Sequence, residues 1–274
     1  MAKNKDLMEP DGEVTPIALT EPEPGTWIFD LGQNMVGWCR IRAKGEAGTT
    51  ITLRHGEMLE ADGTLYTENL RGVAQTDQFV LKGDSNEELF EPRFTFHGFR
   101  YVEVTGFPGK PTLDSLVGRV VGSDVERTGW FECSDPLVNR LFQNILWSQR
   151  GNFLSIPTDC PQRNERMGWT GDAQVFAPAA CYNFDCAAFY NKYLQDVRDA
   201  QFENGAYPVV APQVAGMGGG VNAWGDAGVI VPWVVYQRYG DLALLAEHFD
   251  SMTAWIEFQR QNSDGQIGRA SCRE

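Results

Sequence analysis

The feature that most constrains the fold is a change in the spacing of apolar residues near residues 126–129. Before this point, short runs of β-branched and aromatic residues alternate with turns that contain Gly, Pro, Asn or Asp. Ile51 and Leu53 alternate with polar neighbours, as in a strand with one solvated face. This half has no long helical period, so we predict an antiparallel β-sandwich over residues 25–126.

After Gly129 the apolar spacing becomes helical. Ser134, Asp135 and Pro136 offer a cap and a first-turn proline, and the apolar residues from Leu137 to Leu146 fall on one helical face. Four further helices are expected at about 172–182, 186–203, 226–239 and 242–261, with Asp185 and Asp241 as caps and Gly240 as a stop. The fourth is apolar on nearly every side and the fifth is amphipathic, which predicts an α/α barrel over residues 127–262 that five helices leave incomplete.

Two end segments fall outside these domains. Residues 1–24 are rich in Pro and Glu, and we expect a linker or the remnant of an upstream domain there. Residues 263–274 form a polar tail without structural logic, which is compatible with a non-native origin.

Charge and composition exclude several classes of partner. The formal net charge of −14 disfavours binding to nucleic acid and to anionic membrane surfaces, which need clustered Lys and Arg. The sequence contains neither an apolar run of the ~18 to 20 residues that a membrane helix needs nor a signal-peptide stretch at its N-terminus, so we expect a cytoplasmic protein. The six cysteines and the three histidines, His55, His97 and His248, lack metal-ligand spacing, so we expect reduced thiols and structural histidines.

The residues that carry chemistry are concentrated in the loop between the first two predicted helices, Thr158–Asp172. This loop holds carboxylates and arginines that could bind sugar hydroxyls, an indole that could lie against a sugar's C–H face, and a carboxylic acid that could protonate a leaving oxygen. These residues are Asp159, Arg163, Glu165, Arg166, Trp169 and Asp172. The simpler alternative is a salt-bridged connector, but this set of side chains favours a sugar site.

A second cluster, residues 221–226, follows the glycine run 216–220. Trp224 and Asp226 could present an aromatic platform and a carboxylate on a rim loop. An equally weighted alternative makes Asp226 a helix N-cap and Trp224 a packing residue. Phosphate binding is disfavoured, because neither Lys nor Ser/Thr follows in P-loop spacing.

Four segments resemble the bacterial and fungal α-L-rhamnosidases of glycoside hydrolase family 78. The block DCPQRNERMGWTGDAQ at 159–174 is similar to that family's signature DCPQRDER-x-GWTGDAQ. FDLGQNMVGW at 29–38 and HGFRYVEV at 97–104 resemble its accessory β-domain, and NAWGDAGVIVPW at 222–233 resembles a later segment of its catalytic (α/α)6 barrel. The resemblance therefore implies a fragment that holds the β-domain and the first part of the barrel.

The resemblance also implies roles for individual residues in the inverting hydrolysis of terminal, non-reducing α-L-rhamnose. Glu165 would be the general acid, Asp159, Arg163 and Asp172 would hold the rhamnose hydroxyls, and Trp169 and Trp224 would shape the pocket. One departure is Asn164, where the family usually has Asp. The lost charge lies next to the acid, and we expect a small effect on turnover, because this position is not one of the family's sugar contacts.

The family's general base is a Glu well downstream of the second cluster, so we expect this chain to lack it and to be inactive alone. Asp226 and Glu247 are available carboxylates, but no motif assigns either of them. We expect a small-molecule or oligosaccharide rhamnoside as the substrate and no cofactor or metal, since two carboxylates and water suffice. The sequence is compatible with a homo-oligomer. Two alternatives stay open: a non-catalytic carbohydrate-binding protein, and a β-sandwich interaction module with a helical appendage.

Overall fold

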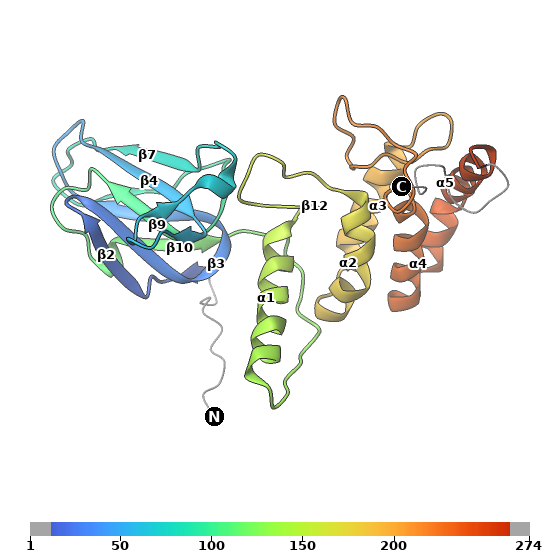
Figure 1. The fold of residues 1–274 in the computed structure, drawn as a ribbon, viewed down its shortest axis with the longest axis horizontal. Coiled ribbons are helices and arrows are strands. Elements are labelled where there is room, and N and C mark those ends of the chain that lie inside the picture. The colour runs from blue at the N-terminus through green and yellow to red at the C-terminus, as the bar shows by residue number, and fades with distance from the viewer. Residues whose placement is uncertain (1–11, 264–274) are drawn as a thin grey trace. The chain divides into compact units, whose positions relative to one another are not determined.

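The computed structural model describes residues 12–263, which form two compact units. One unit contains the chain up to Gly122 together with the segment Cys160–Glu165, and the other contains Ser123–Asp159 and the residues from Arg166 onward. We describe each unit by itself. The predicted order, an antiparallel β unit followed by a helical unit, is confirmed (Figure 1).

The β unit is built on one eight-stranded antiparallel sheet in the order β1-β10-β3-β9-β4-β7, with β2 and β8 also paired to β3. The strands are β1 (Glu13–Val14), β2 (Ala18–Glu23), β3 (Thr26–Ala43), β4 (Thr50–Gly56), β7 (Thr76–Val80), β8 (Glu88–Phe90), β9 (His97–Thr105) and β10 (Leu116–Val120). A short ribbon of β5 (Met58–Leu59) and β6 (Leu65–Tyr66) and the 3₁₀ turns Glu68–Leu70 and Leu113–Ser115 complete this unit.

Strand β3 organises the sheet because it is long enough to have different partners at its two ends. Its first part pairs with β2 and its last part pairs with β10 and β8, while β9 pairs with residues of both parts. The pairing with β9 contains a bulge between Asp30 and Met35, where β3 bends and the sheet curls over. At Gly37, where φ is +154°, an added Cβ would lie 1.8 Å from the carbonyl oxygen of Arg119, so only glycine permits the approach of β10.

The prediction of a linker over residues 1–24 is wrong where the structure describes this segment. β1 pairs with β10 and β2 pairs with β3, so Glu13–Val14 and Ala18–Glu23 belong to the sheet. Pro22 and the glutamates lower strand propensity, but β2 pairs on one side with β3, and pairing along a sheet edge overrides a weak local preference. Residues 1–11, and the predicted tail except for Ser263, lie outside the described residues.

Up to Ser263, the last residue that the structure describes, the helical unit contains five α-helices, close to the predicted positions. They are α1 (Pro136–Asn152), α2 (Thr170–Asn183), α3 (Ala187–Asp199), α4 (Ala227–Tyr239) and α5 (Leu242–Gln261), and a ribbon of β11 (Phe153–Leu154) and β12 (Ile156–Pro157) follows α1. The Asp135 and Asp241 side chains accept hydrogen bonds from the amides of Leu137 and Leu244, as N-caps do. Gly240 ends α4 with φ of 71°. Asp185 lies one residue before the N-cap, and its carboxylate accepts from the amide of Ala187.

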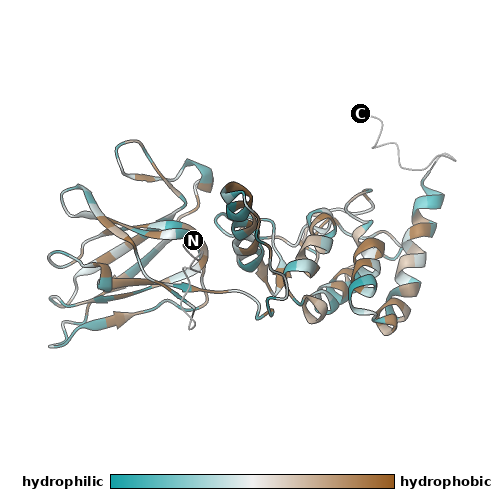
Figure 2. Cartoon of the chain, turned by 90° about the horizontal axis from the view of Figure 1, so that it is seen from below, coloured by the Kyte–Doolittle hydropathy of each residue, from teal (hydrophilic) through white to brown (hydrophobic). Residues whose placement is uncertain are grey.

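Helix α4 is central to this unit because it contacts α2, α3 and α5. Its buried face includes Val231 and Val235, and the ring of Tyr207 covers Gly228 so closely that a Cβ there would lie 2.1 Å from it. Apolar and polar residues share each helix, as amphipathic packing requires (Figure 2). None of the helices in residues 12–263 combines the length and the apolar character needed to cross a membrane.

Candidate functional site

In the loop Thr158–Asp172, the residues that belong to the helical unit are held by backbone and side-chain hydrogen bonds. The amide of Met167 donates to Asp159 Oδ1 at 2.8 Å, and the amide of Asp159 donates to the Met167 carbonyl at 3.0 Å. Gly168 accepts from the amide of Ala211 at 2.9 Å, and a Cβ on Gly168 would lie 2.2 Å from the Ala211 carbonyl oxygen. This segment therefore needs glycine at position 168, and its contacts fix the backbone of the signature at Asp159 and at Met167–Gly168.

Helix α2 then begins directly after the loop. The amide of Thr170 donates to the Val209 carbonyl at 3.0 Å, and its buried hydroxyl donates to the carbonyls of Pro208 and Val209. Asp172 is exposed in the first turn of α2, where the helix dipole favours a negative side chain. The start of α2 thus presents a carboxylate toward solvent from a fixed backbone.

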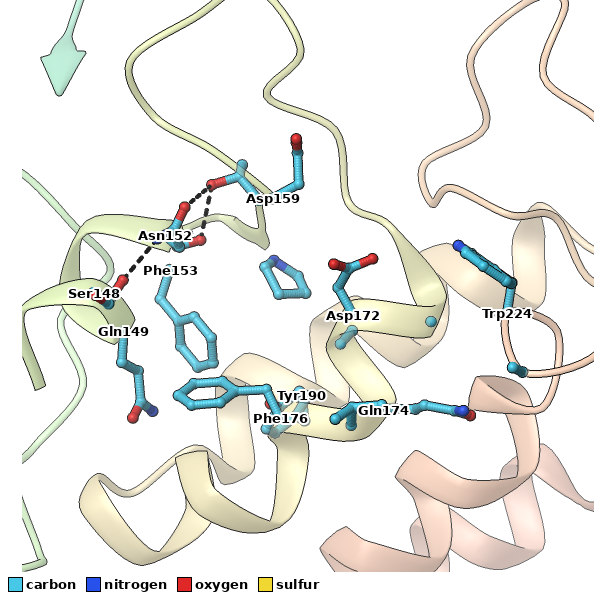
Figure 3. Close-up of a pocket in the computed structure, with 16 residues that line it drawn as sticks. Ser148, Gln149, Asn152, Phe153, Asp159, Asp172, Gln174, Phe176, Tyr190 and Trp224 are labelled. Carbon is cyan, nitrogen blue, oxygen red and sulfur yellow. Dashed lines mark hydrogen bonds between the residues drawn. The ribbon is translucent and has the colours of Figure 1, made fainter. Parts of the chain in front are cut away.

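A cavity of about 540 Å³ lies in the helical unit and contains three of the predicted site residues, Asp159, Asp172 and Trp224. In the view of Figure 3 the two carboxylates lie above the rings of Phe153 and Phe176. The other residues that line it are Ser148, Gln149, Asn152, Pro157, Thr158, Gly171, Ala173, Gln174, Val175, Tyr190 and Ala223. Carboxylates together with aromatic and amide groups are the side chains that bind a hydroxylated ring.

Trp224 reaches this cavity because Gly171 leaves space for it. A Cβ on Gly171 would lie 3.1 Å from the indole, and the Trp224 side chain stays about one-third exposed, at 36%. Asp226 instead holds the loop in place: its carboxylate accepts from the amide of Ala223 at 2.8 Å and from Trp255 Nε1 at 3.1 Å. Asp226 is the N-cap residue of α4 by position, as one of the two alternatives expected, but its side chain makes no cap hydrogen bond, and it is not among the residues that line the cavity.

The first half of the signature, Cys160–Glu165, groups with the β unit. Gly98 of β9 lies against Pro161 and Gln162, and a Cβ there would approach both to about 3.0 Å. Glu165 Oε2 accepts from Arg163 Nη2 at 3.0 Å and Nε at 3.2 Å, and from Arg71 Nη1 at 3.3 Å. Two guanidinium groups therefore converge on one carboxylate oxygen.

The remaining predicted residues have other surroundings. Trp169 is half-buried as the N-cap residue of α2 and forms a β-bridge with Val210, and it is not one of the cavity's lining residues. Asn164 is exposed.

Sequence reasoning missed several side chains at these places. Gln149 and Asn152 line the cavity. The sequence could have indicated them, because they are polar residues three positions apart on the apolar side of α1. Tyr190 lines it too, and burial raises the pKa of its hydroxyl well above the ordinary value. Arg71 had no signal, because it lies 94 residues before Glu165.

Two of the histidines come together in the β unit. The rings of His55 and His97 stack with centroids 4.0 Å apart, His55 Nδ1 pairs with the Gln75 carbonyl at 3.0 Å, and His97 Nε2 pairs with Asp77 Oδ2 at 3.0 Å. The nitrogens and the carboxylate are close enough to be considered as metal ligands. However, the rings are only 16° from parallel, so their lone pairs cannot converge on one ion without breaking the stack. This arrangement fits a buried polar network better than a metal centre.

Both halves of the chain match known protein families. Residues 20–122 match the bacterial alpha-L-rhamnosidase concanavalin-like domain, and residues 126–272 match the bacterial alpha-L-rhamnosidase six-hairpin glycosidase domain. An alpha-L-rhamnosidase of Streptomyces avermitilis is 57% identical over 247 residues, which cover 90% of this chain and 24% of that protein. One from Formosa agariphila is 44% identical over 238 residues, covering 86% of this chain and 26% of that protein.

Solved structures similar to this chain are also alpha-L-rhamnosidases. The crystal structure of the Streptomyces avermitilis alpha-L-rhamnosidase complexed with L-rhamnose superposes with a TM-score of 0.90 at 56% identity, covering 92% of this chain and 24% of that one. The crystal structure of the native Aspergillus terreus enzyme superposes with a TM-score of 0.84 at 45% identity, covering 89% of this chain and 29% of that one. Because the six-hairpin match alone covers more than half of the chain, this chain belongs to the bacterial α-L-rhamnosidase family of glycoside hydrolases, and it spans about a quarter of the length of its curated relatives.

Proposed function

We propose that the protein to which this chain belongs hydrolyses terminal α-L-rhamnosides, and that this segment supplies the acid side of the site. Glu165 would give its proton to the glycosidic oxygen as the bond from that oxygen to the sugar's C1 breaks, and a water oxygen would bond to C1 from the opposite face. A general base would take the proton of that water.

The observation that carries the proposal is the cavity that joins Asp159, Asp172 and Trp224 in a chain of this family. The two carboxylates are suited to accept hydrogen bonds from rhamnose hydroxyls, and the indole is suited to lie against the sugar's C–H face. Arg163 and Trp169 complete the proposed set of sugar-binding residues, on the strength of the signature alone.

We place the general base outside this segment. The two carboxylates considered for that role are engaged elsewhere: Asp226 holds Trp255 and Ala223, and Glu247 pairs with Arg198 at 2.7 Å. The hydrogen bond and the charge of Arg198 also lower the pKa of Glu247. A base must be free to accept a proton from water, so neither group suits the role.

A chimera tests this proposal. In it, the part of this chain that matches the Streptomyces avermitilis relative over 247 residues replaces the corresponding segment of that relative. We expect no turnover of an aryl α-L-rhamnoside by the 274-residue chain and full turnover by the chimera, with the reducing sugar released in the inverted configuration. Turnover by the chain alone would refute the placement of the base, and a folded chimera without turnover would refute the proposed activity.

Binding is tested separately on the chain itself. Titration of L-rhamnose should give saturable binding that Asp172→Ala weakens, while Asp84→Ala, which removes an exposed carboxylate of the β unit, leaves it unchanged. A chimera that binds rhamnose but never hydrolyses rhamnosides would instead support the carbohydrate-binding alternative.

A further inference from the structure

We infer that Arg71, which the family signature does not contain, is a positioning residue for the general acid Glu165. This inference rests on the proposed function, because it concerns how that acid works. Its observation is the hydrogen bond from Arg71 Nη1 to Glu165 Oε2 at 3.3 Å, within the β unit.

Arg71 is presented by a turn that is anchored on both sides. Leu70 is 3% exposed, and Asn69 Nδ2 donates to Glu57 Oε2 at 3.1 Å. The amide of Arg71 itself donates to the Glu68 carbonyl, and the amide of Val73 donates to the Leu70 carbonyl. The backbone that carries the guanidinium is therefore fixed, even though its side chain reaches out toward Glu165.

The backbone of Arg71 is also in a conformation that arginine rarely adopts. Its φ of 54° and ψ of 36° lie in the left-handed region, which costs a residue with a Cβ free energy that glycine would not lose. The ion pair with Glu165 does not offset this cost, because the Arg71 side chain is 60% exposed and exposed pairs contribute little to folding stability. A role at Glu165 gives a reason for arginine at this position.

The way in which Arg71 would assist Glu165 follows from its hydrogen bond to the carboxyl group. Three N–H groups, two of Arg163 and one of Arg71, donate to Oε2 of Glu165, so this oxygen of the acid is an acceptor. When the carboxyl group gives its proton to the glycosidic oxygen, negative charge develops on it. Donors already in place at Oε2 stabilise that charge in the transition state without further reorganisation.

This role predicts an effect that depends on the leaving group. A poor leaving group, such as an alkoxide, needs the proton of Glu165, whereas 2,4-dinitrophenolate departs almost unaided. In the chimera, Arg71→Ala should lower kcat/KM by about tenfold or more for a methyl or 4-methoxyphenyl α-L-rhamnoside, and by less than about threefold for the 2,4-dinitrophenyl substrate. The change should fall on kcat, because Arg71 is not assigned a contact with the sugar.

Two further variants show whether the effect is specific. Arg71→Lys should recover part of the activity, since the ammonium group restores the charge but not the planar fork. Arg54→Ala is the matched control: Arg54 pairs with Glu103 at 2.8 Å in the same unit and is 44% exposed, and it should leave all substrates unchanged.

The possible results separate this inference from the proposed function. An equal loss on all leaving groups, or no loss, would overturn the role of Arg71. If Glu165→Gln were itself without effect on the poor leaving group, the proposed acid would be wrong. If Glu165→Gln abolished that activity while Arg71→Ala did not, only the inference about Arg71 would fail.

Discussion

Removal of the Asp226 carboxylate should destabilise the helical unit without removing a sugar contact. Asp226 accepts one hydrogen bond from Trp255 Nε1 and one from the amide of Ala223. In an Asp226→Ala variant, both donors lose their partner. Since Asp226 holds the loop that carries Trp224, the cavity wall should loosen as well.

The magnitude follows from the burial of the two donors. Trp255 is 1% exposed, so its N–H would stay without a partner, at a cost of ~2–3 kcal/mol. Ala223 is exposed, and water can replace its lost bond at a cost of about 0.5–1 kcal/mol. We therefore expect Asp226→Ala to lower the free energy of unfolding of this unit by ~2.5–4 kcal/mol.

Urea unfolding followed by circular dichroism at 222 nm measures this quantity, because all the α-helices of the described residues belong to the helical unit. A double-mutant cycle with Trp255→Phe isolates the hydrogen bond, since phenylalanine has no N–H to strand. The coupling between the two positions should be about 1–2 kcal/mol. A loss below about 0.5 kcal/mol for Asp226→Ala, or strict additivity in the cycle, would refute the reasoning.

Three other predictions concern the β unit, the loop and the cavity. Burial and the neighbouring charge of His97 lower the pKa of His55 to about 3 from 6.5, so the unfolded chain binds a proton there that the folded chain does not, and stability should rise with pH between these values. His55 should add ~1.4 kcal/mol per pH unit to the slope of the unfolding free energy against pH, and His55→Asn should remove this contribution. A variant with the wild-type slope would contradict the prediction. Gly168→Ala, whose Cβ would lie 2.2 Å from a backbone oxygen, should lower the free energy of unfolding by ~2–3 kcal/mol or more. Gly218→Ala is the control and should lower it little, because no atom lies within 4 Å of its Cβ. Equal melting temperatures for the two variants would contradict this. Trp224→Ala should weaken L-rhamnose binding by about tenfold in a titration, whereas Trp233→Ala, half-exposed on α4, should not; equal affinities for both would contradict it.

The helical unit was predictable from the sequence because its signals are local. Asp135 with Pro136 marks the start of α1, and Gly240 with Asp241 marks the boundary between α4 and α5, and each signal acts within one turn of the chain. The main error was in length: α3 ends at Asp199 rather than near 203.

The β unit was predictable in class but not in topology. The two sets of partners of β3 depend on a bulge and on contacts between distant segments, and neither leaves a mark in local spacing. The same reason explains the missed strand β2, whose Pro22 and glutamates argue locally for a linker.

The candidate site divides in the same way. The contiguous signature identified Asp159 and Asp172, and their lining of one cavity follows from a single loop and the helix after it. Contacts between distant positions could not be read from the sequence, such as Arg71 with Glu165 or Asp226 with Trp255. The latter contact turned a candidate sugar-binding carboxylate into an anchor.

The most direct test of the central claim is the activity of Glu165→Gln in the chimera. Glutamine keeps the size and hydrogen bonding of the side chain but has no proton to give. We predict that kcat on a 4-methoxyphenyl α-L-rhamnoside falls by about 10²–10⁴-fold while the affinity for L-rhamnose stays within about threefold of the parent. Turnover within a few-fold of the parent would contradict the assignment of Glu165 as the acid that this segment supplies.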